Sequence, residues 1–198
     1  MLAGLAGAGW YVTSAREAAR RNSLFIQQLD QAERERGDVL KLLFEGMASL
    51  KSEEAQVAID WLAERQDRGE LPYLYVIGLY YAKLDTDRKR LQGLEYLARG
   101  ALVYRVDAAQ CGHASANQAV AIFENAVGLG RIRDSLKGRA ELRQKVVTNA
   151  LEFEERRKHR VRPEWACRHG VAQAGAPLSQ AAMQAHREKV RAQFRGTF

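Results

Sequence analysis

The chain contains two similar helical segments, and their spacing constrains its fold more than any other feature. The segments cover residues 58–65 and 93–100. Each runs through a small residue, an aliphatic, an acid, a large aromatic and then Leu-Ala, and the two aromatics, Trp61 and Tyr96, lie 35 residues apart. A period of this size is typical of helix pairs that stack on their neighbours. The stretch 52–104 is therefore predicted to form a short helical array on which the rest of the chain packs.

The composition favours a helical domain with a real core. Of the 198 residues, 46% are hydrophobic and only three are proline. The length suffices for one such domain, and the apolar content argues against disorder. The long uninterrupted stretches are rich in Ala, Leu, Arg, Glu and Gln, which favour helices, and no run shows the alternation of a strand. The predicted class is all-α, an α/α helical-repeat short solenoid with additional packed N- and C-terminal helices.

Glycine, proline and capping residues divide the chain into helices and three regions. The first region, 1–36, is an apolar segment and a helix; the second, 37–130, is the array; the third, 131–198, is a long basic helix and a C-terminal tail packed on the array. Apolar spacing and helix-end signals predict helices over 14–36, 39–50, 54–68, 72–83, 88–104, 115–127, 131–160 and 180–193. Asp38 and Ser52 are predicted N-caps, and residues 85–87 hold two further candidates. One face of the helix over 115–127 is predicted to carry Ala119, Ile122, Phe123 and Ala126. The helix over 131–160 is predicted to be the longest. The last one has few large apolar residues and is predicted to be peripheral.

The first twelve residues are apolar and uncharged. They are too few to span a bilayer, which takes about 20 residues, and they lack the positive start of a secretory signal. Arg16, Arg20 and Arg21 follow them, as cations follow the end of a membrane anchor. Two interpretations stay open: the end of an anchor whose beginning lies outside this sequence, or the first turns of a packed helix. Membrane association is expected only through such an anchor.

Three short motifs share a pattern: Ala-x-x-Trp-Leu at 58–62, Ile-Gly-x-x-Tyr at 77–81 and Gly-x-x-Tyr-Leu at 93–97. They resemble SEL-one-like repeats, a tetratricopeptide-related family. The family pairs a first helix containing Leu-Gly-x-x-Tyr with a second containing Lys-Ala-x-x-Trp-Leu. The resemblance covers roughly residues 43–104. Gly93 and Tyr96 depart from the family's Ala and Trp, and residues 84–87 replace its Gly-rich turn. An ordinary helical domain fits the same periodicity.

The resemblance implies a protein that binds other proteins in a groove lined by the first helix of each pair. On that basis, the exposed members of one set are predicted to contact the partner: Tyr73, Tyr75, Tyr80, Lys83 and Arg88. Trp61 and Tyr96 are predicted to lie in the core, since aromatics fill the space between stacked helices. Gly78 is predicted to mark a close helix crossing.

Two Cys-x-His motifs leave three interpretations open. They are Cys111-Gly112-His113 and Cys167-Arg168-His169. Two Cys and two His could hold zinc, although the spacing within each pair differs from a zinc finger. A Cys111–Cys167 disulfide would pin the C-terminal segment to the array and would require an oxidising compartment. The third interpretation is two unrelated thiols. No metal and no cofactor is predicted.

Positive charge is concentrated in the last third of the chain. Residues 131–198 hold 16 Lys or Arg and 7 Asp or Glu, whereas the first 130 residues carry a net charge of −2. The densest run supplies candidate contacts to an anionic partner: Arg156, Arg157, Lys158, Arg160 and Arg162. These could contact nucleic-acid phosphates, but the run lacks the interleaved aromatics of a single-strand platform. The alternatives are a frayed helix end paired with Glu152, Glu154 and Glu155, or a site for an acidic protein.

No catalytic motif is recognisable. The sequence lacks a Gly-x-Ser-x-Gly elbow, a Walker-type loop, a dinucleotide fingerprint and a His-Glu-x-x-His pair. We therefore expect a non-enzymatic protein–protein interaction module, an adaptor or an assembly or inhibitor protein, whose partner is another protein, with an acidic one among the candidates. The rival is a nucleic-acid-binding helical domain that uses the basic C-terminal third. The apolar N-terminus and the disulfide interpretation favour the cell envelope or periplasm over the cytoplasm.

Overall fold

The computed structural model describes residues 19, 23–84, 86–157, 161–168 and 178–198, and every regular element in them is a helix. The all-α prediction is confirmed. The elements are α2 (Leu24–Arg34), α3 (Val39–Ser49), α4 (Ser52–Ala63), α5 (Tyr73–Lys83), α6 (Asp87–Asp107), the 3-10 helix η1 (Ala108–Cys111), α7 (Ser115–Ala126), α8 (Leu129–Ser135), α9 (Ala140–Arg156), α10 (Glu164–Cys167) and α11 (Gln180–Thr197). The expectations for residues 1–12 lie outside the described residues.

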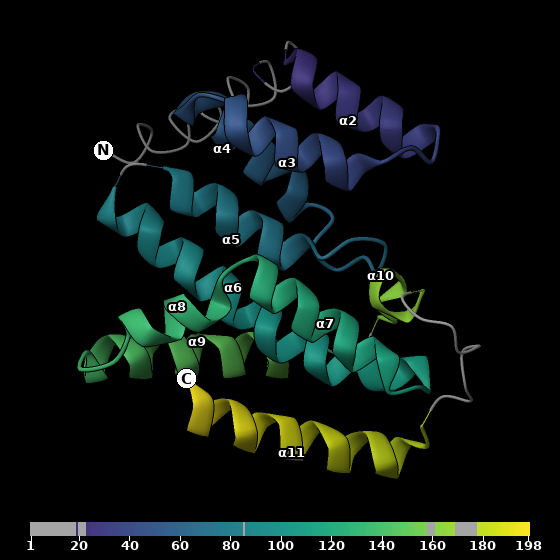
Figure 1. The fold of residues 1–198 in the computed structure, drawn as a ribbon, viewed down its shortest axis with the longest axis vertical. Coiled ribbons are helices and arrows are strands. Elements are labelled where there is room, and N and C mark those ends of the chain that lie inside the picture. Colours follow the sequence, from purple (N-terminus) through teal and green to yellow (C-terminus); the bar gives the residue numbers. More distant parts are fainter. Residues whose placement is uncertain (1–18, 20–22, 85, 158–160, 169–177) are drawn as a thin grey trace, which may run out of the picture.

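The helices follow one another along the long axis of the molecule. Figure 1 shows α2, α3 and α4 together at one end, α5 and α6 next to them, α7, α8 and α9 around α6, and α11 at the end opposite α2. In sequence, α4 packs on α5 and α5 packs on α6, and α9 and α11 then pack on α6. Of the helices in the described part of the chain, none is both long and apolar enough to cross a membrane.

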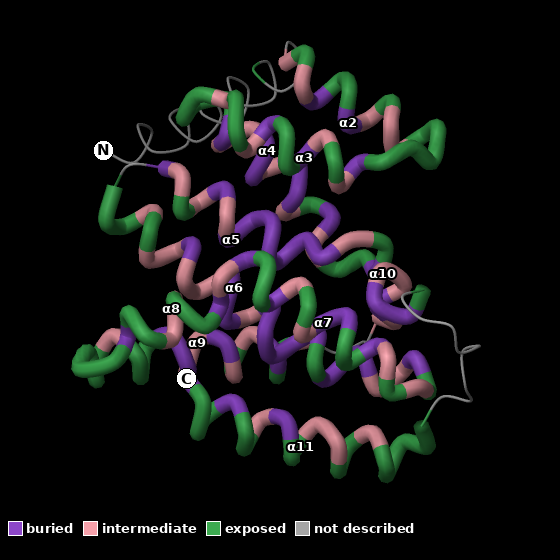
Figure 2. The backbone as a smooth tube through the Cα atoms, in the orientation of Figure 1, coloured by how far each residue is buried: buried purple, intermediate pink, exposed green. Residues whose placement is uncertain are grey.

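Two hydrophobic cores meet at α5. The first core contains buried residues of α2 to α5, from Ile26 to Leu84. The second core runs from Leu74 to Phe198 and joins α5 and α6 to the later helices. Figure 2 shows the buried backbone concentrated along α5 and the middle of α6. The two cores therefore meet along α5, which contributes buried residues to both.

Capping residues begin several helices where the sequence predicts them. The Asp38 carboxylate accepts a hydrogen bond from the Lys41 amide at 2.9 Å, and the Thr86 hydroxyl accepts one from the Lys89 amide at 3.2 Å. Both satisfy amides that the first helical turn leaves without partners. At α4 the helix begins earlier than expected, so Ser52 is its first residue and not its cap.

Two glycines allow α5 and α6 to approach closely. A Cβ atom on Gly78 would lie 2.5 Å from Cγ of Leu97, and one on Gly93 would lie 2.9 Å from the Gly78 carbonyl oxygen. Neither distance is compatible with a side chain there. The prediction that Gly78 marks a close crossing is confirmed, and Gly93, which replaces alanine in the family motif, serves the same contact.

Trp61 is fully buried in the first core, as predicted. Its indole nitrogen donates a hydrogen bond to Asp30 at 2.7 Å, and the Arg65 guanidinium lies 3.8 Å from its ring centroid. Arg65 also donates to Glu33 from Nε at 3.0 Å. Tyr96, in contrast, is only half-buried, and its ring stacks on that of Tyr81 with the ring centroids 5.5 Å apart.

The ion pair between Arg65 and Glu33 predicts a pH-dependent contribution to stability. The hydrogen bond from Arg65 lowers the pKa of the Glu33 carboxyl below its ordinary value, although partial burial opposes this. The stabilisation is therefore complete above the unfolded-state pKa and is lost as pH falls through the lower folded-state pKa. We expect Glu33→Gln to cost about 0.5–1 kcal/mol at pH 7 and nothing at the acid end of a series of urea unfolding curves. A constant difference across the series would contradict this, and Glu35→Gln on the same helix end is the control.

The prediction of one long helix over 131–160 is wrong. The chain forms two helices there, α8 and α9, and Gly138 in the turn between them has φ 77°. A left-handed residue of this kind ends a helix, and glycine adopts it without strain. Leu136 and Val146, on either side of the turn, both face the second core, so the apolar spacing in the sequence looks like that of a single helix. The longest described helix is α6, with 21 residues.

The last helix is not peripheral. It extends to Thr197, and Val190, Phe194 and Phe198 are buried in the second core. Its few apolar residues suffice because they share one face. On the same helix the Arg187 guanidinium donates a hydrogen bond to the buried carboxylate of Glu154 in α9 at 2.7 Å.

Candidate interaction surface

The three predicted contact tyrosines are buried, so they cannot line an open groove. Tyr73 is 2% exposed, and Tyr75 and Tyr80 are 0% exposed. The Tyr80 hydroxyl donates to the Leu43 carbonyl at 2.7 Å, and the Tyr75 hydroxyl donates to the Glu124 carboxylate at 3.1 Å. Burial raises the pKa of Tyr73 to about 12 and also raises the pKa of Tyr80. These residues belong to the core and are removed from the set of partner contacts.

The reason lies in the composition of α5. Its sequence, YLYVIGLYYAK, is apolar or aromatic around the whole helix until Lys83. A helix without a polar face is surrounded by other elements, and α5 packs against α3, α4 and α6. This signal was present in the sequence, and it identifies a central helix and not a groove-lining one.

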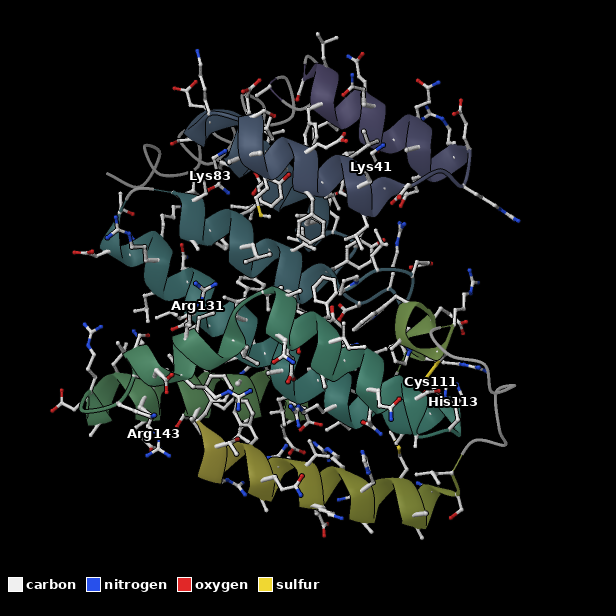
Figure 3. The ribbon with its side chains drawn as sticks, in the orientation of Figure 1. Lys41, Lys83, Cys111, His113, Arg131 and Arg143 are labelled. Atoms are coloured by element: carbon white, nitrogen blue, oxygen red, sulfur yellow. A yellow bond between two sulfur atoms is a disulfide. The ribbon has the colours of Figure 1, made fainter. Side chains whose placement is uncertain are left out.

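Lys83 and Arg88 remain from the predicted set. The Lys83 ammonium donates to the Met47 carbonyl at 2.6 Å, near the end of α3, where carbonyls lack helical partners. Figure 3 shows Lys83 reaching toward that end of α3. Arg88 is exposed in the first turn of α6. Lys83 therefore has a structural role, and Arg88 is a surface cation at the first turn of its helix.

One member of the basic run, Arg157, is turned inward, whereas the side chains of Arg156 and Arg162 are exposed. The Arg157 side chain is only 9% exposed, and its guanidinium lies 2.8 Å from the Asp67 carboxylate and 3.7 Å from that of Asp107. These contacts tie the end of α9 to the loop after α4 and to the end of α6. Arg157 therefore stabilises the fold through these ion pairs and is not accessible to an anionic partner.

The other described members of the run also have acidic neighbours. Arg156 lies 3.6 Å from Glu152, and Arg162 lies 3.3 Å from Glu164. Lys158 and Arg160 lie outside the described residues. The pairing of Arg156 with Glu152 agrees with the interpretation of a helix end, whereas Glu154 and Glu155 take their partners from α11.

Cys111 and Cys167 form a disulfide that ties η1 to α10. Their Cα atoms are 5.1 Å apart and both side chains are buried (Figure 3). The His113 imidazole lies beside the bond, with Nε2 3.2 Å from the Cys167 carbonyl oxygen and Nδ1 2.7 Å from the Ser115 hydroxyl. Since a carbonyl only accepts, Nε2 carries the proton toward Cys167.

A zinc site is not supported by this arrangement. The disulfide uses both sulfur ligands that the interpretation needs. Within the described ranges, no three His, Cys, Asp or Glu side chains gather where they could hold a metal ion. His169 lies outside those ranges.

A polar cavity of about 550 Å³ lies beside Tyr73, between the α2–α3 turn and the segment before α5. Arg36, Arg68 and Arg168 line it together with Glu33. The charges are partly satisfied within the fold, since Arg68 lies 2.8 Å from Glu33. Val39, Leu71 and Tyr73 also line the cavity.

An exposed phenylalanine of α3 meets a partly buried phenylalanine of α7, and neither was among the contact residues predicted from the sequence. Phe44 of α3 is 38% exposed, and its ring centroid lies 6.3 Å from that of Phe123 in α7. The Phe123 ring stacks on that of Tyr75 and meets that of Trp165 in α10 edge-on, with centroid distances of 5.5 Å in both cases. The exposed Phe44 ring thus contacts Phe123, and the rings of Tyr75 and Trp165 hold Phe123 in place.

Ile122 adds to this surface because α7 is rotated from its expected orientation. The sequence predicts a face made of Ala119, Ile122, Phe123 and Ala126, but the helix buries Ala116, Ala119, Val120 and Glu124. Ile122 is 66% exposed as a result. The buried Glu124, held by Arg105 and the Tyr75 hydroxyl, sets this rotation.

We define the α3–α7 surface by four residues: Leu40, Phe44, Ile122 and Phe123. Leu40 is half-buried and lies one turn before Phe44 on α3. Lys41, labelled in Figure 3, stands at the edge of this surface and is paired with Glu45 at 3.9 Å. An apolar centre with a charged edge is the usual composition of a protein-binding surface.

The chain matches no family model, no curated protein and no solved structure. The resemblance to SEL-one-like repeats therefore stays a prediction. Function has to be argued from the surface itself.

Proposed function

We propose that this chain is a non-enzymatic protein–protein interaction module, an adaptor or an assembly or inhibitor protein, that binds its partner through the α3–α7 surface. The observation that carries the proposal is the contact between the exposed Phe44 and Phe123, with the exposed Ile122 next to Phe123 in the sequence of α7. Contiguous exposed apolar side chains on a folded domain are typical of interaction sites. Lys41 at the edge suits a partner with acidic residues around an apolar centre.

Neighbouring aromatic rings hold Phe123 of the α3–α7 surface in place, which favours binding. Phe123 is fixed between Phe44, Tyr75 and Trp165, so little conformational freedom remains to be lost on association. Aromatic anchors of this kind carry most of the binding energy in measured interfaces. The proposed mechanism is the covering of Phe44 and Ile122 by apolar side chains of the partner.

The short-solenoid arrangement belongs to the same proposal. What supports it is the order of packing, in which α4, α5 and α6 stack consecutively, and the close approach of α5 and α6 at Gly78 and Gly93. The disulfide supports an oxidising compartment such as the bacterial envelope.

A substitution pair tests the contact residues. We expect Phe44→Ser with Ile122→Ser to weaken partner binding at least tenfold, because roughly 2 kcal/mol or more is typical for losing an aromatic anchor. The matched control is Leu24→Ser on α2, where the leucine is 74% exposed and does not belong to this surface. Equal affinities for the double variant and the control, measured by titration calorimetry, would contradict the proposal.

Site-specific photocrosslinking identifies the partner independently of any loss of function. A photoreactive phenylalanine analogue replaces Ile122 in one protein and Leu24 in another, and both are irradiated in extract of the source cell. The proposal predicts a discrete crosslinked protein from position 122 only. Crosslinks of the same pattern from both positions would place the interface elsewhere.

A further inference from the structure

The position of α10 depends on the Cys111–Cys167 disulfide. This helix has four residues, whereas a helix needs roughly 12–15 to be stable on its own. It packs beside α7 (Figure 1), and the disulfide joins its last residue to η1. Its other contacts include the buried Ala166 side chain and a hydrogen bond that the Trp165 amide donates to the Gly69 carbonyl at 3.2 Å. The disulfide is therefore a large part of what fixes this short helix.

Trp165 connects α10 to the α3–α7 surface. Its ring centroid lies 5.3 Å from that of Tyr104 and 5.5 Å from that of Phe123. Phe123 in turn contacts the exposed Phe44 of α3. Trp165 is two positions before Cys167, so a movement of α10 away from η1 takes this ring with it. Phe123 then loses one of the rings that fix its position.

The buried position of the Trp165 indole is unfavourable for its N–H group. The nitrogen is buried, and among the described residues no oxygen or nitrogen accepts a hydrogen bond from it. The Trp61 indole, by contrast, donates to Asp30 at 2.7 Å. A buried donor without a partner loses the hydrogen bonds that water would give it. Release of α10 lets Trp165 recover these bonds, so the disulfide holds the indole where its N–H group is not satisfied.

The surroundings of the bond suit thiol–disulfide exchange at Cys167. The Arg162 Nε atom donates to the Cys167 sulfur at 3.3 Å, although Glu164 shares this guanidinium at the same distance. A cation beside a sulfur stabilises its thiolate and makes it a better leaving group. Cys167 is 7% exposed and Cys111 is 0% exposed. An incoming thiolate therefore reaches Cys167 first.

We propose that the Cys111–Cys167 disulfide is a redox switch for the α3–α7 surface: reduction by a dithiol releases α10 with Trp165, and the surface then binds its partner more weakly. This regulation rests on the proposed function. One thiolate of the dithiol attacks Cys167, the disulfide breaks, and Cys111 leaves as a thiolate that takes up a proton. The second thiol of the dithiol then displaces Cys167, which is protonated in turn. The dithiol becomes a disulfide, and two electrons pass to this chain.

Fluorine NMR of the full chain labelled with 5-fluorotryptophan follows the release itself. The chain holds three tryptophans, and Trp165→Phe and Trp10→Phe assign their resonances. On complete reduction with dithiothreitol, we expect the Trp165 resonance to move toward its position in the urea-unfolded chain. The resonance of Trp61, which lies in the first core, should stay in place. An unmoved Trp165 resonance would overturn the proposal, and so would an equal movement of both, because that indicates unfolding of the whole domain.

Photocrosslinking from position 122 measures the consequence for binding. The reduced protein is freed of dithiothreitol by gel filtration without oxygen, so the reagent does not reach the partner. We expect the crosslinking yield to fall about fivefold or more on reduction, because association then has to order Phe123 again. Trp165→Phe keeps an aromatic ring and lacks the unsatisfied N–H group, so its yield should fall by less than about twofold.

The outcomes separate this proposal from the proposed function. An unchanged yield for reduced wild type, or equal falls for wild type and Trp165→Phe, would overturn the redox switch. The absence of any crosslinked protein from oxidised wild type would instead contradict the proposed function. The fluorine spectra decide in that case whether reduction releases Trp165.

Discussion

Replacing Glu154 with alanine is expected to destabilise the protein by about 3–5 kcal/mol, the cost of leaving buried charges without a partner. Glu154 is 0% exposed, and its carboxylate accepts hydrogen bonds from Arg187 at 2.7 and 3.0 Å and from Arg191. The hydrogen bond to Glu154 raises the pKa of Arg187, so this guanidinium stays charged. Without Glu154 two arginines of α11 face the second core with only Glu155 nearby, and α11 loosens.

The comparison with Glu155 makes this prediction specific. Glu155 contacts the same two arginines, at 2.9 Å each, but its side chain is 60% exposed. We expect Glu155→Ala to cost about 0–1 kcal/mol, as exposed ion pairs do. Urea unfolding of both variants measures the difference. Equal losses of stability would show that burial does not determine how much each carboxylate contributes.

Removing the disulfide is expected to cost about 2–5 kcal/mol. The bond joins residues 56 positions apart and fixes α10, which carries Trp165 against Phe123 and Tyr104. Cys111→Ser with Cys167→Ser should lower the thermal midpoint by roughly 10 °C for a chain of this size. The main physical reason is that the unfolded chain regains the freedom that the bond removes.

Reduction of the wild-type protein provides the internal control. A reducing agent should lower the wild-type midpoint to near that of the double serine variant and leave the variant unchanged. Equal midpoints for reduced and oxidised wild type would contradict a stabilising Cys111–Cys167 bond. A free-thiol titration under denaturing conditions confirms which form is present in each sample.

Helix positions could be predicted from the sequence because their signals are local. Asp38 and Thr86 begin helices through hydrogen bonds to amides three residues later, and Gly78 marks a crossing that any larger residue would block. The split between α8 and α9 was missed because Gly138 is only one residue, whereas the apolar spacing on both sides of it favours a single helix.

The candidate site was harder to predict because exposure depends on distant parts of the chain. Tyrosine is common both in cores and at interfaces, so Tyr75 and Tyr80 alone do not reveal their burial; the apolar composition of the whole of α5 does. Ile122 looked like a core residue until Glu124 took the inward position on α7.

The most direct test of the proposed function is affinity capture from extract of the source cell, split into nuclease-treated and untreated halves. The baits are the wild type, the Phe44→Ser and Ile122→Ser double variant, and the Leu24→Ser control. We expect a protein partner that the wild type and the control retain in both halves and that the double variant loses. A partner that disappears with nuclease, or that the double variant retains, would contradict a protein-binding role for the α3–α7 surface.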